Sequence, residues 1–196
     1  MQVTDNIVLQ LAGLSDSREL FDLVNANRQY LRTWLPWLDI NRSETDTAAF
    51  LRFVMEQHQA GRGPHYLVFF DSKLCGMCGF HPLDNRNRIG GIGYWLAEQY
   101  SGKGIMTRCV SALLDQGYRE YNLNRIEIAC ATENFKSRAI PERLGFKLEG
   151  ILRANEYLYE RYVDHAVYSM LASEFEALRS LRPIGGNLMA SDKVLK

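Results

Sequence analysis

The sequence is short of the residues that build several classes of protein. Its 196 residues include four cysteines and four histidines, and 23 basic side chains are balanced by 23 acidic ones. Four cysteines are too few for a disulfide scaffold, and a chain without net charge lacks the positive field typical of nucleic-acid binding. No apolar run approaches the roughly 18–20 residues of a membrane span, and residues 1–5 do not follow the plan of a signal peptide. We therefore expect a soluble, cytoplasmic protein without a membrane or nucleic-acid partner.

Metal ligands are equally scarce. Cys75, Cys78 and His81 form a C-x2-C-x2-H string, but zinc requires four ligands and no further cysteine or histidine follows at finger spacing. We predict buried thiols in a glycine-rich pair of strands and no metal site. The four histidines show no spacing typical of a catalytic triad, and none is assigned a role.

Hydrophobic residues make up 46% of the chain, enough for one core. Alternating patterns predict seven strands and helical spacing predicts four helices. A strand, a glycine turn, a helix and a strand over residues 88–131 form a β-α-β crossover, whose strands should be parallel. We expect an α+β domain over residues 1–182 with a mixed sheet of about seven strands, and a disordered tail over residues 183–196. The expected strands cover residues 3–11, 65–70, 74–80, 88–96, 125–131, 146–159 and 162–171, and the helices begin near residues 16, 43, 104 and 137.

The turn that opens the third helix is the most informative segment. Gly102 and Gly104 leave the main chain open to a bulky anion, and Lys103 and Arg108 supply positive charge nearby. The first N–H groups of a helix also bind anions. An ordinary glycine turn is the alternative. The spacing excludes a Walker loop, because a glycine follows Lys103, and it excludes a Rossmann fingerprint, because Thr107 stands in place of the third glycine.

Two motifs resemble the GNAT superfamily of N-acetyltransferases. The segment SGKGIM over residues 101–106 is similar to the family's pyrophosphate loop, [Q/R]-x-x-G-x-[G/A], although Ser101 and Met106 depart from it. The segment ENFKSRAIPERLGF over residues 133–146 is similar to the pattern E-N-x-x-S-x-x-x-x-E-[KR]-x-G-F. The resemblance covers residues 5–172. It implies the GNAT fold, in which helices lie on both faces of the sheet and two parallel strands splay apart.

The resemblance implies acetyl-CoA as co-substrate and no metal. It further implies that the backbone N–H near Leu96 stabilises the oxyanion formed during acyl transfer. Neither Ser101 nor Met106 is expected to make the family's usual contact. The residues expected at the cofactor are Tyr94, Trp95, Leu96, Ser101, Gly102, Lys103, Gly104, Ile105, Met106, Asn134, Ser137 and Arg138.

Two residues are expected to carry the chemistry. By the resemblance, Glu156 is the base that takes the amine proton and Ser137 donates to the departing thiolate. Each has a plainer alternative: Glu156 as a surface carboxylate paired with Arg161, and Ser137 as the cap of the following helix. Asn134, in turn, could form only an Asx turn.

The acceptor side depends on the tryptophans and on local charge. Trp34 and Trp37 are expected at the acceptor mouth, whereas the Trp95 side chain is expected to belong to the core. Residues 101–153 contain nine basic and six acidic side chains, residues 1–63 contain six and eight, and residues 154–164 contain one and three. This distribution predicts a cationic cofactor side opposite a mildly acidic acceptor side.

Residues 30–37, 92–96 and 154–158 resemble the branch that includes RimL-type ribosomal-protein N-terminal acetyltransferases. The expected acceptor is therefore the N-terminal α-amino group of a ribosomal protein. A small-molecule amine acetyltransferase acting on a polyamine or an aminoglycoside, and a non-catalytic acyl-CoA-binding module, are the alternatives. A homodimer through the C-terminal hairpin is also considered.

Overall fold

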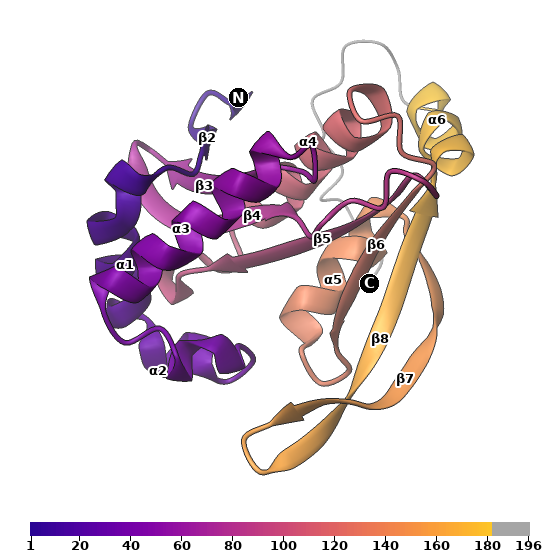
Figure 1. The fold of residues 1–196 in the computed structure, drawn as a ribbon. Coiled ribbons are helices and arrows are strands. Elements are labelled where there is room, and N and C mark those ends of the chain that lie inside the picture. Colours follow the sequence, from indigo (N-terminus) through magenta and orange to yellow (C-terminus); the bar gives the residue numbers. More distant parts are fainter. Residues whose placement is uncertain (182–196) are drawn as a thin grey trace.

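The computed structural model describes residues 1–181 as a twisted sheet between two layers of helices (Figure 1). The strand order is β1-β2-β3-β4-β5-β6-β8-β7, and only the central neighbours β5 and β6 run parallel. The expected mixed sheet, with its crossover at this position, is confirmed. The strands are β1 Gln2–Thr4, β2 Ile7–Leu11, β3 His65–Phe70, β4 Lys73–Phe80, β5 Ile89–Leu96, β6 Arg125–Ala131, β7 Lys147–Leu158 and β8 Arg161–Leu171.

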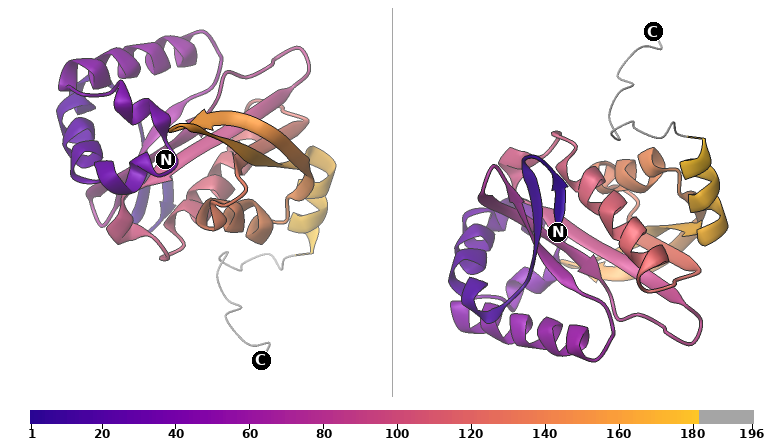
Figure 2. Two further views of the ribbon diagram at one scale, coloured as in Figure 1. Left: turned by 90° about the horizontal axis from the view of Figure 1, so that it is seen from below. Right: turned by 90° about the horizontal axis from the view of Figure 1, so that it is seen from above.

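Helices cover both faces of the sheet (Figure 2). Helices α1 and α3 pack on β3 and β4, while α4 and α5 pack on the opposite face. Within residues 1–181 no helix is long and apolar enough to cross a membrane. The tail expected over residues 183–196 lies outside the described residues. The helices are α1 Ser17–Ala26, α2 Arg28–Arg32, α3 Glu44–Gln59, α4 Ile105–Arg119, α5 Phe135–Leu144 and α6 Ala172–Ser180, with 3-10 turns η1 Leu14–Asp16, η2 Pro36–Asp39 and η3 Glu98–Tyr100.

The first expected strand is in fact a hairpin. β1 and β2 pair across a two-residue turn at Asp5 and Asn6, so the sheet has eight strands where the sequence predicts about seven. Helix α6 is also absent from the sequence prediction. It is short, and Phe175 is its one buried residue, so it has almost no apolar period to detect.

The first expected helix divides into α1 and α2 at Asn27. The Asn27 side chain is buried, and its Nδ2 donates to the Leu23 carbonyl at 2.9 Å while its Oδ1 accepts from the Glu98 N–H at 3.1 Å. One side chain therefore both ends α1 and holds the loop after β5. Asp16 stands at the N-cap position of α1, but its side chain makes no capping bond to the helix and accepts from the Gly13 N–H at 2.9 Å.

Cys75 and Cys78 lie in the core as the sequence predicts, and the other two cysteines are buried as well. Cys75, Cys78, Cys109 and Cys130 are all buried free thiols. Among the described residues no group of three or more His, Cys, Asp or Glu side chains is arranged to hold a metal ion.

Close backbone packing explains one of the strand glycines and gives a stability prediction. A Cβ added at Gly79 would lie 2.6 Å from the Pro64 carbonyl oxygen and 2.7 Å from the His65 Cα. Because backbone atoms cannot move aside cheaply, we expect Gly79→Ala to lower the free energy of unfolding by about 1–3 kcal/mol in urea titrations. Gly150→Ala is the control, since its Cβ would meet nothing within 4 Å. Equal midpoints for the two variants would contradict this packing.

Candidate active site

The parallel strands at the centre of the sheet separate soon after they meet. β5 and β6 pair over three positions only, Ile89 to Gly91 with Arg125 to Glu127. β5 nevertheless continues to Leu96 and β6 to Ala131. Figure 1 shows the two strands diverging below this point. The splayed pair implied by the resemblance is therefore present.

The splay leaves a row of backbone groups on β5 without a strand partner. His81 N–H donates to Gly91 O and Ala97 N–H donates to Cys75 O, each at 2.8 Å, so these alternate residues of β5 point to β4. By the alternation of an antiparallel pair, the N–H and C=O groups of Ile92, Tyr94 and Leu96 point to the opposite side, toward β6. An extended ligand with amide groups can pair with them as an added strand.

The anion site predicted at the start of α4 has the required backbone. Gly102 and Gly104 have φ of 78° and 70°, the left-handed region that glycine adopts without strain. The first helical hydrogen bond runs from Arg108 N–H to Gly104 O at 3.2 Å. The N–H groups of residues 105–107 therefore precede the hydrogen-bonded part of the helix and point outward from its positive end.

Charged and polar side chains surround this loop. The Lys103 ammonium lies 5.3 Å from the centroid of the Tyr100 ring, and Arg108 Nη1 donates to Lys103 O at 3.1 Å. Ser101 Oγ forms a hydrogen bond of 3.1 Å with Tyr30 Oη, so its hydroxyl is held by the α2 segment. Ile105 and Met106 are buried under the first turn. The loop is thus anchored to the core by Ile105 and Met106, and Lys103 and Arg108 give it a positive charge.

Tyr94 and Ser137 face each other across the splay. Tyr94 Oη donates to Ser137 O at 3.0 Å, and Ser137 Oγ lies 3.3 Å from Tyr94 Oη. In a regular helix the Ser137 carbonyl would accept from residue 141, but Pro141 has no N–H, so this carbonyl is free for Tyr94. Burial raises the pKa of Tyr94, which keeps its hydroxyl protonated.

The residue that caps α5 is Asn134 and not Ser137. Helix α5 begins at Phe135, and its cap is Asn134, whose Oδ1 accepts from Ser137 N–H at 3.1 Å. The alternative in which Ser137 caps the helix is therefore wrong. Asn134 is itself the cap, because its side chain reaches the N–H three residues on, whereas the Asx turn considered for it would reach the N–H two residues on. Arg138, expected at the cofactor, is held by Tyr168 Oη at 2.8 Å and by the Thr132 carbonyl at 2.9 Å.

Glu156 has a histidine partner that sequence reasoning missed. Glu156 Oε2 lies 3.2 Å from His165 Nε2, with 32% and 16% of the two side chains exposed. The alternative pairing with Arg161 is absent, because Arg161 instead contacts Glu133 at 3.4 Å. A β-bulge between Leu152 and Glu156 brings about this contact, since four residues of β7 advance against two of β8.

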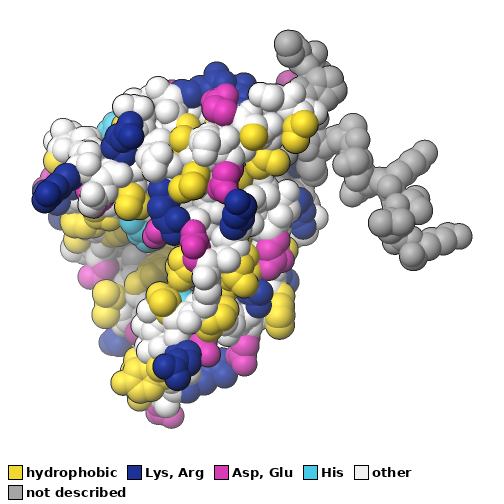
Figure 3. Space-filling view, turned by 90° about the vertical axis from the view of Figure 1, so that its right-hand side faces the viewer, with side chains coloured by type: hydrophobic (Ala, Val, Ile, Leu, Met, Phe, Trp, Pro, Cys, Tyr) yellow, Lys and Arg dark blue, Asp and Glu magenta, His cyan; other side chains and the backbone are white. Residues whose placement is uncertain are grey.

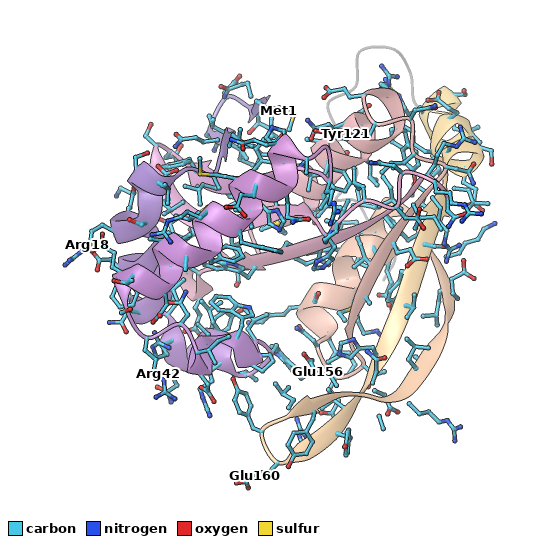
Figure 4. All side chains as sticks on the ribbon, in the orientation of Figure 1. Met1, Arg18, Arg42, Tyr121, Glu156 and Glu160 are labelled. Carbon is cyan, nitrogen blue, oxygen red and sulfur yellow. The ribbon has the colours of Figure 1, made fainter. Side chains whose placement is uncertain are left out.

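The tip of the β7–β8 hairpin contacts the α2–η2 segment. Tyr159 Oη donates to the Leu35 carbonyl at 3.1 Å, and the Arg32 guanidinium lies 3.8 Å above the Tyr159 ring. Trp34 packs in the same cluster, against Ala131, Leu158 and Val163. This contact, the hairpin clasp, joins the α2–η2 segment to the hairpin that carries Glu156. Figure 4 labels Glu156 to the right of α2 and above Glu160 at the hairpin tip.

The hairpin clasp leads to a prediction of modest size. Tyr159→Phe removes one neutral, partly buried hydrogen bond, so we expect the free energy of unfolding to fall by about 1 kcal/mol. Amide exchange in residues 157–162 should accelerate as the tip separates from α2. Tyr162→Phe, at a tyrosine that is 67% exposed, is the matched control and should change neither quantity. Equal exchange rates in both variants would show that the clasp contributes nothing.

The remaining tryptophans form one cluster. Trp95 and Trp37 pack with ring centroids 6.4 Å apart, next to the buried Val24, Leu31 and Leu38. Trp95 therefore packs into a hydrophobic cluster, on the face of β5 opposite Tyr94. Trp37 joins it there, while Trp34 packs against Leu158 and Val163 of the hairpin.

Comparison with known proteins agrees with this geometry. The family model described as "Acetyltransferase (GNAT) domain" matches residues 6–147. YdaF of Bacillus subtilis (strain 168), provisionally named a ribosomal N-acetyltransferase, is 36% identical over 177 residues, which are 89% of this chain and 96% of that protein. The ribosomal-protein-serine acetyltransferase of Escherichia coli (strain K12) is 29% identical over 171 residues, covering 87% and 96%.

Solved structures extend the comparison. A RimL ribosomal L7/L12 α-N-protein acetyltransferase in complex with coenzyme A superposes with a TM-score of 0.84 at 30% identity, covering 87% of this chain and 96% of that one. The microcin C7 self-immunity acetyltransferase MccE, in complex with acetyl-CoA and AMP, reaches 0.82 at 30% identity and covers 87% and 95%. With the family model matching most of its length, this chain belongs to the GNAT family of N-acetyltransferases.

Proposed function

We propose that this enzyme transfers the acetyl group of acetyl-CoA to the N-terminal α-amino group of a ribosomal protein. Two relatives that match nearly their whole length are named for acetylation of ribosomal proteins. The observation that carries the proposal is the separation of β5 and β6, which leaves backbone partners for the cofactor between the glycine loop and Glu156. A cytoplasmic location belongs to the same proposal, because ribosomal proteins are made there.

The cofactor would use main-chain groups more than side chains. The pyrophosphate binds the N–H groups that follow Gly102 at the positive end of α4, with Lys103 and Arg108 beside it. The pantetheine arm, which contains two amides, pairs with the backbone of Tyr94 and Leu96. This arrangement brings the thioester to the end of β5, where the Leu96 N–H can stabilise the oxyanion of the tetrahedral intermediate.

The chemistry needs one base and one proton donor. The amine nitrogen attacks the thioester carbonyl carbon directly, and Glu156 takes the proton that the nitrogen loses. An α-amino group has a pKa of about 7.7–8.0, against about 10.4 for a lysine side chain, so an N-terminal amine is already partly neutral near pH 7. A carboxylate is therefore a sufficiently strong base for an N-terminal acceptor. His165 Nε2, 3.2 Å from Glu156, holds the carboxylate in place.

The leaving thiolate takes its proton from Ser137 as the carbon–sulfur bond breaks. Ser137 Oγ lies 3.3 Å from Tyr94 Oη, and that tyrosine is protonated because burial raises its pKa. The protonated Tyr94 hydroxyl can therefore donate a hydrogen bond to the Ser137 oxygen once the proton has passed to the thiolate. Burial also raises the pKa of the Cys130 thiol, so we assign it no part in proton transfer.

A panel of acceptors tests the proposal. Thiol release from acetyl-CoA should follow addition of peptides with a free α-amino group, and should not follow addition of α-acetylated peptides that contain lysine. A small-molecule acceptor is the second candidate, because the similar MccE is an immunity enzyme against microcin C7. Turnover of polyamines or aminoglycosides alone would establish that alternative. Binding of coenzyme A without turnover of any amine would indicate a non-catalytic module.

A homodimer through strand β7 is the last part of the proposal. β7 is an edge strand, and Leu148, Ile151 and Leu152 on it are 44–51% exposed. Figure 3 shows apolar side chains between charged ones on this side of the molecule. An unpaired edge is complementary to itself under a two-fold axis. Sedimentation of a Leu152→Lys variant as a monomer, beside a wild-type dimer, would support this interface.

A further inference from the structure

A basic depression lies on the outer side of the α2–η2 segment. Its volume is about 300 Å³. Three of its lining residues are arginines and one is an aspartate, so two positive charges remain after Asp39 is counted. We call this depression the arginine site; it is lined by Asn25, Arg28, Arg32, Leu38, Asp39 and Arg42.

The three arginines differ in how many of their guanidinium N–H groups are already used in hydrogen bonds within the protein. Arg28 is structural, donating to Leu38 O at 2.7 Å and Asn41 O at 2.8 Å. Arg32 uses Nε and Nη2 on the Asp39 carboxylate at 2.7 and 2.9 Å. The Arg42 guanidinium donates only through Nε, to Asp39 O at 2.6 Å, and within residues 1–181 its two terminal nitrogens make no hydrogen bond or ion pair. The end of this guanidinium is thus available to a ligand.

Asp46 is a second carboxylate close to Arg42, but within residues 1–181 the two side chains form no ion pair. Asp46 Oδ2 accepts from the N–H groups of Arg42 and Ser43 and from Ser43 Oγ, at 2.8–3.0 Å, which fixes it at the start of α3. Asp46 does not line the depression. The acidic excess of residues 1–63, which the sequence places on the acceptor side, is therefore not found at the arginine site.

Tyr159 connects the arginine site to the hairpin that carries Glu156. Arg32 lies over the ring of Tyr159, and Tyr159 follows Glu156 by three residues on the same hairpin. A chain extended from Glu156 along the clasp rises about 3.3 Å per residue, so it reaches Arg32 within a few residues. Figure 4 labels Arg42, Glu156 and Glu160 toward the same end of the molecule.

We propose that the arginine site binds acidic side chains of the acceptor protein, located a few residues after the amino group that is acetylated. This inference rests on the proposed function. Guanidinium groups bind carboxylates through paired N–H donors, which suits Asp or Glu side chains. An RNA backbone is less suited, because it requires cations along an extended strip, whereas these three arginines converge on one depression beside the hairpin.

Two matched peptides test the inference. They share the first two residues and carry either Asp and Glu or Asn and Gln at positions three to six. We expect kcat/KM to be about tenfold higher for the acidic peptide at low salt, and the preference to shrink as salt screens the charges. Arg42→Gln should reduce the preference to about threefold and leave the neutral peptide unaffected, and Arg42→Glu should reverse it.

Arg52→Gln, at an exposed arginine on α3 outside the depression, is the matched control and should keep the full preference. Equal kcat/KM for the two peptides would overturn the inference and leave the proposed function standing. Failure to acetylate either peptide would instead count against the proposed function. In that case, the binding affinity of a fluorescently labelled form of the acidic peptide tests the inference. Loss of this binding in the Arg42→Glu variant would support it. Unchanged binding in that variant, or displacement of the peptide by oligouridylate but not by the unlabelled acidic peptide, would overturn it.

Discussion

Replacing Glu156 by glutamine is expected to lower kcat by about 100-fold to 1,000-fold while the dissociation constant for acetyl-CoA stays unchanged. Glutamine keeps the size of the side chain and can still contact His165, which lies 3.2 Å away in the native enzyme. It cannot accept a proton from the attacking amine. Stopped-flow or steady-state thiol release, together with calorimetric titration of coenzyme A, separates the two quantities.

The control for Glu156 is Glu160, another glutamate of the same hairpin. Glu160 lies in the two-residue turn at the tip with φ of 68°, so Glu160→Gln changes the same charge a short distance away. It should keep nearly full activity. An unchanged kcat in the Glu156→Gln variant would show that the base is elsewhere.

Placing a negative charge at Gly102 is expected to weaken coenzyme A binding about 100-fold. Gly102 has φ of 78°, and a Cβ there would meet nothing within 4 Å, so the folded protein has room for a side chain. Aspartate and asparagine tolerate this conformation better than other residues. The carboxylate of Gly102→Asp would stand where the pyrophosphate is proposed to bind, and repulsion over about 4 Å is worth several kcal/mol at a protein surface.

Gly102→Asn is the control that separates the effect of the negative charge from the effect of an added side chain. It has the same size and the same backbone tolerance as aspartate, and we expect it to weaken coenzyme A binding by about tenfold or less. Thermal unfolding of the two variants without ligand should agree. If both variants bound coenzyme A as the native protein does, the glycine loop would not be the phosphate site.

Local features of the fold could be predicted from the sequence. The pattern of Ser43 and Asp46 predicts a helix start, and both bonds of that capping box are present. The β3–β5 meander and the crossover through α4 follow from alternation and glycine punctuation over short stretches. The glycine loop could also be predicted, because its backbone conformation is determined by residues that are adjacent in the chain.

Contacts set by distant register could not be predicted. The bulge before Glu156 determines that this carboxylate contacts His165, and nothing in the spacing of the two residues reveals it. Arg161, the partner considered from sequence, is closer along the chain but is drawn to Glu133. Asn27 is a further example, since its buried side chain joins α1 to the loop after β5 across 71 positions.

One tertiary contact does have a partial signal in the sequence. Pro141 predicts an interrupted hydrogen-bond ladder in α5. The consequence is one turn earlier, at Ser137, whose carbonyl accepts from Tyr94. The position of a helical proline identifies the carbonyl that loses its N–H partner, here Ser137 O, although it does not identify Tyr94 as the donor.

Acetyl transfer from isotope-labelled acetyl-CoA into a cell lysate, followed by mass spectrometry of protein N-termini, lysines and small amines, identifies the acceptor of this enzyme. We expect label on the α-amino group of one or a few ribosomal proteins, and no such label with the Glu156→Gln variant. Label confined to lysine side chains, or to small amines, would contradict this expectation.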